Sequence, residues 1–69
     1  MATSLKVYYD ADGKTLTVWF DDPNKEFIAE ETGEEVIIIK DRDNKVIGFE
    51  RLNLPLESGQ DLKIEAIVV

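Results

Sequence analysis

The sequence predicts a small all-β protein, with a single antiparallel sheet of about five strands, curled or half-barrel in form. Two observations support this prediction. Short runs of residues alternate between apolar and polar, as in strands with one buried face, and residues that favour turns separate these runs. The chain has 69 residues, enough for one domain, so we expect residues 1–69 to form a single β-rich domain.

The first two strands are predicted at residues 5–9 and 16–20, because apolar and other side chains alternate in both. Between them, Asp12-Gly13 supplies the short polar residue and the glycine of a tight turn. We choose the register that keeps six apolar side chains on one face, because a shift of one residue would mix the faces. The predicted pairs are Tyr9 with Leu16, Val7 with Val18 and Leu5 with Phe20, and on the other face Lys6 with Trp19.

Residues 22–33 leave two alternatives open. Asp22-Pro23 and Gly33 are a typical start and stop of a helix. However, Phe27 and Ile28 are the only bulky apolar residues between them, and two neighbours do not form the stripe of a packed helix. We therefore favour a short strand or extended segment here, with a helix as the alternative.

A second hairpin is predicted from residues 36–40 and 46–52, joined by a turn at residues 41–45 in which Asn44 can adopt a left-handed conformation. The first run is β-branched and too short for a helix. Both faces of the hairpin carry apolar side chains, so it should be central in the sheet or covered on its second side. The predicted pairs are Ile39 with Ile47, Ile37 with Phe49 and Glu35 with Arg51.

The inward-facing side chains of these strands make up the predicted core. A chain this short buries only ~60% of the surface that it exposes when unfolded, which leaves little margin of stability. The predicted core comprises Leu5, Val7, Tyr9, Leu16, Val18, Phe20, Ile37, Ile39, Ile47, Phe49, Leu62 and Ile64.

Residues 62–69 predict a last strand whose end is apolar on both faces, which is unusual in water unless something covers it. The sequence has no cysteine and no histidine, so it lacks disulfides and the usual zinc ligands. Self-association is then the remaining source of stability, and we expect a homodimer. Either this strand closes the sheet of its own monomer, or it lies at a dimer interface formed by Ile67, Val68 and Val69.

Acidic residues are concentrated in one segment of a chain whose net charge is −7. From Asp21 to Glu35 there are seven acidic residues and one lysine, a net charge of −6. This segment would repel nucleic acid, so we expect no nucleic-acid partner. It is either a solubilising surface or a functional one, namely a docking face for a basic protein or a weak cation site. The candidate partner-binding residues are Glu30, Glu31, Glu34 and Glu35.

Few side chains could perform catalysis. A general base would have to be a carboxylate or a lysine, and the only serines are Ser4, near a chain end, and Ser58, in a predicted loop. Glu50 should share the face of Val46 and Leu52, where partial burial would raise its pKa, but a purely structural strand glutamate is the simpler interpretation. We therefore expect no enzyme activity and no cofactor.

Two turns, at residues 10–14 and 41–45, carry aspartates with a spacing similar to that of calcium loops. Each has a lysine, Lys14 or Lys45, where an EF-hand needs an oxygen ligand, so we interpret both as ordinary turns and expect no metal site. No apolar run approaches the ~20 residues of a membrane span, and residues 1–6 lack the features of a signal peptide. We expect a cytoplasmic protein without a membrane partner.

Several short motifs resemble a family of small prokaryotic proteins classed as a domain of unknown function. The matching residues are Tyr9-Asp10 with Leu16-Thr17-Val18, then Glu30-Glu31-Thr32, and then residues 41–50, which follow the family's D-x-D-G-x-V-V-G-I-E hairpin with Asn44 in place of the glycine. The resemblance implies a small β-rich fold and no established activity. Some members of that family look like the antitoxin half of two-gene toxin–antitoxin pairs.

These expectations leave two classes of function. The first is a protein-interaction module, antitoxin-like if the resemblance extends so far, whose acidic segment binds a basic partner. The alternative is a homo-oligomeric structural or accessory protein with no specific ligand, whose negative surface only keeps it soluble.

Overall fold

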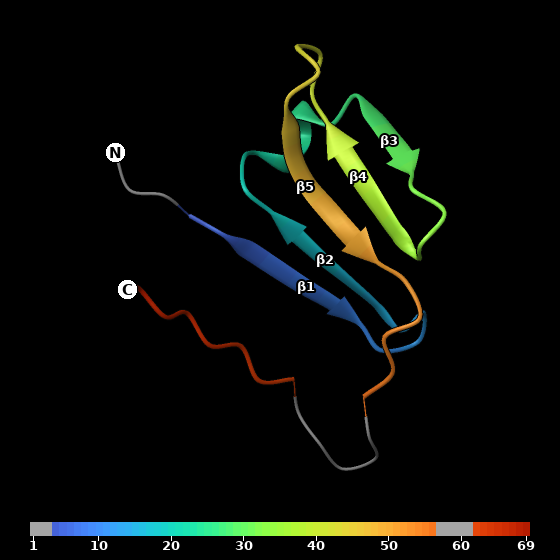
Figure 1. Cartoon of the computed structure of the whole chain (residues 1–69), viewed down its shortest axis with the longest axis vertical. Helices are drawn as coiled ribbons and strands as arrows, with labels where there is room; N and C mark the ends of the chain where they lie inside the picture. Colours follow the sequence, from blue (N-terminus) through green and yellow to red (C-terminus); the bar gives the residue numbers. More distant parts are fainter. Residues whose placement is uncertain (1–3, 57–61) are drawn as a thin grey trace.

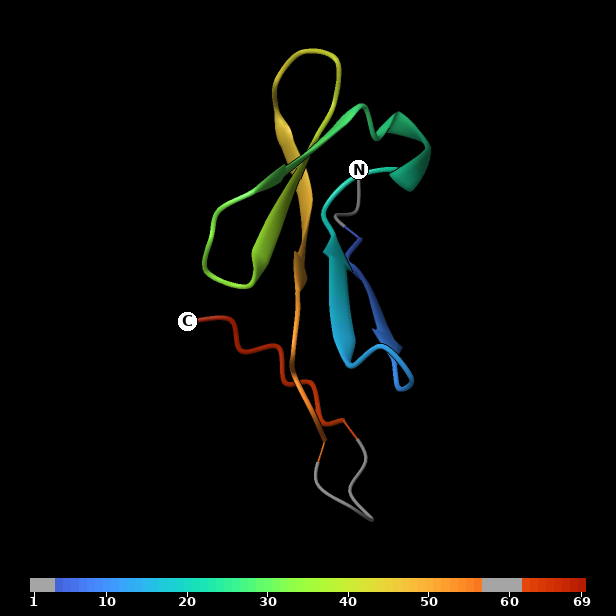
Figure 2. The ribbon, with the colours of Figure 1, turned by 90° about the vertical axis from the view of Figure 1, so that its right-hand side faces the viewer.

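Five strands form one antiparallel sheet in the order β1-β2-β5-β4-β3. The computed structural model describes residues 4–56 and 62–69. The strands are β1 (Lys6–Asp10), β2 (Thr15–Trp19), β3 (Ile28–Glu31), β4 (Val36–Lys40) and β5 (Val46–Arg51). The predicted fold class is confirmed. The sheet is twisted and open, with β1 and β3 as its edges, and it does not close into a barrel (Figure 1, Figure 2).

The first hairpin has the predicted register. Val7 pairs with Val18 and Tyr9 with Leu16, and on the other face Lys6 pairs with Trp19. The match follows from alternation, because any odd shift would place threonines of β2 against the apolar side chains of β1. The predicted pair of Leu5 and Phe20 lies just beyond the paired residues, at the open end of the hairpin.

The connection from β2 to β3 contains both of the alternatives considered for residues 22–33. Asp22 caps a single 3₁₀ turn, η1 (Pro23–Lys25), by accepting a hydrogen bond from the Asn24 backbone N–H at 2.9 Å. The chain then becomes extended in β3. The helix stops after one turn because the segment has no apolar stripe to bury. In the part of the chain that the structure describes, no helix is long and apolar enough to cross a membrane.

This connection must pass β5 and β4 to reach the far edge of the sheet, and backbone hydrogen bonds tie it to both strands. The Phe20 N–H donates to the Ile47 carbonyl at 2.7 Å, and the Phe27 N–H donates to the Lys40 carbonyl at 2.9 Å. Figure 1 shows η1 behind the ends of β4 and β5. This connection, residues 20–27, which we call the crossover, therefore links the two hairpins at one end of the sheet.

The second hairpin has the predicted strands, but the predicted register is wrong. The structure pairs Ile39 with Gly48, Ile37 with Glu50 and Val36 with Arg51, in place of Ile39 with Ile47, Ile37 with Phe49 and Glu35 with Arg51. The register shifts between Ile39 and Lys40, since Lys40 pairs with Val46. Ile47 is thus the extra residue of a β-bulge, and every pair beyond it is displaced by one position.

The bulge places large side chains together in a buried cluster, which consists of Trp19, Ile39 and Ile47. Because two residues of a bulged strand oppose one residue of the partner, Ile47 and Gly48 both lie opposite Ile39. Ile39 and Ile47 are 0% exposed, and Trp19, which pairs with Gly48, is 9% exposed. A Cβ at Gly48 would lie 2.6 Å from the Val18 carbonyl oxygen. Only glycine permits β2 and β5 to approach so closely there.

The predicted core is correct in part. Ile39 and Ile47 are confirmed as buried, whereas Leu5, Phe20 and Ile64 are exposed and were wrongly assigned to the core. The half-buried members are Val7, Tyr9, Leu16, Val18, Ile37, Phe49 and Leu62. Trp19 was not among the predicted core residues, because its burial depends on the glycine that it meets across the strand pair and not on the alternation of β2.

The predicted strand at residues 62–69 is wrong, because these residues form no regular secondary structure and pair with no strand. Figure 1 and Figure 2 show this C-terminal segment running in the direction opposite to β1 and standing clear of it. The alternation of a strand is present in its sequence, but a strand needs a partner, and in this chain the segment has none.

We predict that Gly48→Ala destabilises the protein by ~1–3 kcal/mol, because the added Cβ meets backbone and must push β2 and β5 apart. Urea denaturation at fixed protein concentration measures the change. Gly13→Ala is the control, since the nearest atoms to its Cβ would belong to the side chains of Asp10, at 3.0 Å, and Thr15, at 3.6 Å, and not to backbone. Its expected effect is within about 0.5 kcal/mol. Equal stability of wild type and Gly48→Ala would show that the close approach is not needed.

Candidate functional site

One face of the sheet is apolar across four strands. Side chains alternate along a strand, so the aligned pairs Val7–Val18, Val18–Phe49 and Phe49–Ile38 place these residues in a row on the same side. We call this side the apolar face. Its residues are Val7, Tyr9, Leu16, Val18, Phe20, Val36, Ile38 and Phe49. The buried cluster lies on the other side, where Trp19, Gly48 and Ile39 are aligned.

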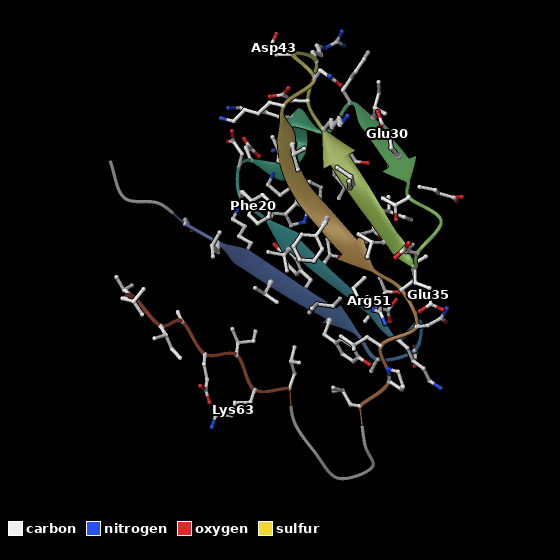
Figure 3. All side chains as sticks on the ribbon, in the orientation of Figure 1. Phe20, Glu30, Glu35, Asp43, Arg51 and Lys63 are labelled. Carbon is white, nitrogen blue, oxygen red and sulfur yellow. The ribbon has the colours of Figure 1, made fainter. Side chains whose placement is uncertain are left out.

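The apolar face is incompletely covered. Phe20 is 43% exposed although its ring lies against that of Phe49, with 5.9 Å between the ring centroids. The other members of the face are half-buried. Figure 3 shows Phe20 at the end of β2, close to the crossover. Arg51 lies at the end of β5, which is the other end of the sheet. A stable sheet normally buries its apolar face against a second layer, and the described part of this chain supplies no such layer.

Among the described residues that follow β5, those at positions 52–54 cover one rim of this face. The Tyr9 hydroxyl donates to the Leu54 carbonyl at 2.6 Å, and the Leu54 N–H donates to the Lys14 carbonyl at 2.9 Å. These bonds fasten residues 52–54 around the turn between β1 and β2. The side chains towards the other end of the hairpin, Phe20 and Leu5, stay exposed.

The total surface of the chain is large for its size. A compact protein of this mass, 7.8 kDa, is expected to expose about 4,400 Å². This chain exposes 5723 Å², roughly 1,300 Å² more than that scaling gives. The excess exceeds the ~800 Å² that each partner buries in an interface of ordinary size. Part of this excess belongs to the exposed C-terminal residues, so it describes the open form of the whole chain and not the sheet alone.

The structure divides the four predicted partner-binding glutamates into two pairs. Glu30 on β3 forms an ion pair with Lys40 at 3.3 Å, and Glu35 forms one with Arg51 at 3.5 Å. Figure 3 shows Glu35 beside Arg51 at the end of β5. Glu31 and Glu34 are exposed and form no ion pair with the described residues. Local cations thus offset part of the segment's charge and leave two carboxylates available to a partner.

The aspartates of the two turns hold the backbone of those turns. The Asp10 carboxylate accepts the Asp12 N–H at 3.0 Å and the Gly13 N–H at 3.2 Å. The Asp41 carboxylate accepts the Asp43 N–H at 2.9 Å and the Lys45 N–H at 3.0 Å. Asn44 lies between them with the predicted positive φ, 65°. Both carboxylates therefore have a structural role in turns, as the sequence predicts.

Glu50 does not share the face of Val46, which corrects the expectation from the sequence. The bulge separates the two residues, so Glu50 lies between Thr17 and Ile37 on the side of the buried cluster and is half-buried. A carboxylate in this position is a cross-strand neighbour of a threonine and an isoleucine. No second acidic side chain is paired with it across either strand.

A shallow hollow of about 380 Å³ lies between the crossover and the turn that joins β4 to β5. The Arg42 guanidinium lies over the Phe27 ring, 4.7 Å from its centroid, at this hollow. Nearby, the backbone N–H of Asp22 and the Lys25 ammonium hold the pKa of the Asp21 carboxyl below its usual value. The sequence does not indicate the contact of Arg42 with Phe27, because these residues are 15 positions apart and are brought together by the pairing of β3 with β4.

The comparison with protein families identifies residues 6–54 as a match to a family model described as "Protein of unknown function (DUF2283)". The chain belongs to this family. The matched region includes all five strands and ends at Leu54, whose carbonyl accepts a hydrogen bond from the Tyr9 hydroxyl. The DUF2283 domain here is therefore the open sheet together with residues 52–54, which cover one rim of its apolar face. No curated protein and no solved structure matches the chain.

The residues predicted at a dimer interface lie outside the DUF2283 domain. Ile67, Val68 and Val69 are exposed and belong to the unpaired C-terminal segment. Their role at an interface stays a prediction. The apolar face, in contrast, lies within the domain, and its members on β1 and β2 follow the predicted alternation.

We predict that Asp41→Ala lowers the stability by ~1 kcal/mol, because two backbone N–H groups of the turn lose their acceptor. Asp43→Ala is the matched control. Asp43 lies in the same turn and carries the same charge, but its side chain accepts no hydrogen bond from the described residues. Thermal unfolding of the two variants, followed by circular dichroism, should separate them. Equal losses would mean that charge, and not capping, accounts for the effect.

Proposed function

We propose that this protein is a protein-interaction module that acts as a homodimer, in which the apolar faces of two sheets pack against each other. The single observation that supports the proposal is an apolar face, four strands wide, that the described part of the chain leaves without a second layer. Packing two such faces produces the two-layer architecture that one copy lacks.

A second copy is a suitable occupant because a twofold contact is self-complementary. Phe20 of each copy would lie in the interface, so every side chain buried there contributes to the free energy of association once from each copy. Burying an aromatic side chain contributes ~1.5–3 kcal/mol, from which the entropy cost of association must be subtracted. Ile67, Val68 and Val69 would extend the same interface.

We expect Phe20→Glu to weaken the dimer at least ~100-fold, because it places a charge on each side of an apolar contact. Phe27→Glu is the matched control, since Phe27 is an aromatic side chain of similar exposure that lies at the hollow beside Arg42, outside the apolar face. Sedimentation velocity over a dilution series gives the dissociation constants, and circular dichroism checks the fold. The proposal fails if the wild type is monomeric at high micromolar concentration or if both variants dissociate equally.

A second candidate function is docking of a basic protein on the acidic segment. The observation that favours it is the pair Glu31 and Glu34, which are exposed and have no cationic neighbour among the described residues. Glu31 also lies on β3, an edge of the sheet, where a partner has access to it. A small basic protein, such as the toxin of a two-gene pair, is the type of partner that this charge would attract.

The docking function predicts that reversing Glu31 and Glu34 to lysine weakens binding of a basic protein encoded next to this chain by ~10-fold or more at low salt. The control reverses Asp12 and Asp43, which changes the net charge equally outside the segment. Titration at increasing ionic strength should weaken wild-type binding, because exposed charges are screened over ~8 Å at physiological salt. Equal binding by the two reversed proteins would contradict docking at this site.

A further inference from the structure

We propose that in the homodimer the C-terminal segment of each copy adds to the outer edge of β1 of the other copy as a sixth, antiparallel strand. This inference rests on the proposed function and specifies how the two chains are joined. It combines two features that one chain leaves unused, namely an apolar segment without a partner and a strand edge without a neighbour.

The C-terminal segment has the alternation of a strand in its sequence, although it forms no regular secondary structure in one chain. The Lys63 ammonium and the Glu65 carboxylate form an ion pair at 2.9 Å. In a strand these two residues would share one side, and Ile64 and Ala66 would project to the opposite side. Ile64 and Ile67 are exposed, with no strand beside them. The segment would therefore gain hydrogen bonds and apolar contacts together on joining a sheet.

Charge favours the edge at β1 over the edge at β3. The β3 edge carries Glu30 and Glu31, which would repel Glu65 of an added strand. The β1 edge has opposite charges at its two ends, Lys6 at the start and Asp10 at the finish. Its middle residues are uncharged, so this edge lacks the charged side chains that usually block strand addition.

The same charges select the antiparallel direction and its register. With Lys63 opposite Asp10, Glu65 lies opposite Tyr8 and diagonal to Lys6, so each charge of the segment meets its opposite. The reverse direction would bring Lys63 against Lys6. In the antiparallel register Ile64 lies beside Tyr9 and Ala66 beside Val7, so the added strand extends the apolar face by one strand.

The direction of the segment in one chain points to exchange between two chains. Figure 1 and Figure 2 show that it runs opposite to β1, as an antiparallel partner must, and that it stands clear of its own β1. Figure 2 also shows its end on the other side of β5 from η1, projecting away from the first hairpin. A second copy packed on the apolar face would offer its β1 edge to this segment, and twofold symmetry forms the contact twice.

A disulfide between two introduced cysteines tests the exchange, and the chain has no cysteine of its own to interfere. Tyr8→Cys with Glu65→Cys places thiols on residues that face each other in the proposed register, at the ~4.5–5.5 Å Cα separation that a disulfide accepts. After oxidation with oxidised glutathione at low micromolar protein, we expect most of the chain as a covalent dimer on a non-reducing gel. Tyr8→Cys with Ile64→Cys is the control. It shifts one cysteine to the opposite face and should form less than ~10% of the covalent dimer.

Each outcome of the cross-linking experiment tests whether the two copies exchange their C-terminal segments. A disulfide within one chain, seen as a monomer of altered mobility, overturns it, because the segment then closes its own sheet. Equal covalent dimer from both pairs, or none from either, also overturns it. Sedimentation of the cysteine-free chain separates this inference from the homodimer. A non-covalent dimer without the disulfide refutes only the exchange, whereas a monomeric chain refutes both.

Discussion

The close contact of β5 with β2 at Gly48 is the constraint on which the rest of the structure depends. β5 is the central strand and joins two hairpins that are otherwise linked only by the crossover. At Gly48 a side chain would collide with the Val18 carbonyl, and the space is used by Trp19. The bulge next to it turns Ile47 towards Ile39, which fills the buried cluster. β1 and β3 then attach to strands already held by this contact.

The same arrangement explains why one side of the sheet stays accessible to a partner. A domain of this size has few large side chains. Those of the buried cluster, Trp19, Ile39 and Ile47, lie on one side of the sheet. The opposite side carries the aromatic pair Phe20 and Phe49 and a row of aliphatic residues with no layer above them. In the proposed dimer, the apolar face of a second copy supplies the layer that the described residues do not provide. This uncovered face is the observation on which the proposed interaction rests.

The charges determine which partners the edges and faces can accept. Glutamates along β3 discourage two copies from pairing at that edge, since like charges would face each other, and they attract a cationic protein instead. Lys40 and Arg51 form ion pairs with Glu30 and Glu35, whereas Glu31 and Glu34 form none with the described residues. The middle residues of β1 and the row of Val7, Val18, Phe49 and Ile38 on the apolar face carry no charge, so they are compatible with a copy of the same acidic chain.

The sequence by itself determined the strands of both hairpins, the register of the first, the capped turns at Asp10 and Asp41, and the acidic character of residues 21–35, because these features depend on near neighbours. Only the tertiary structure decided the register of the second hairpin, because the bulge at Ile47 results from packing against Trp19 and Gly48. It also decided which glutamates are ion-paired, since Lys40 and Arg51 are distant from Glu30 and Glu35 in sequence. Alternation in residues 62–69 predicted a strand but could not supply the neighbouring strand that a sheet requires.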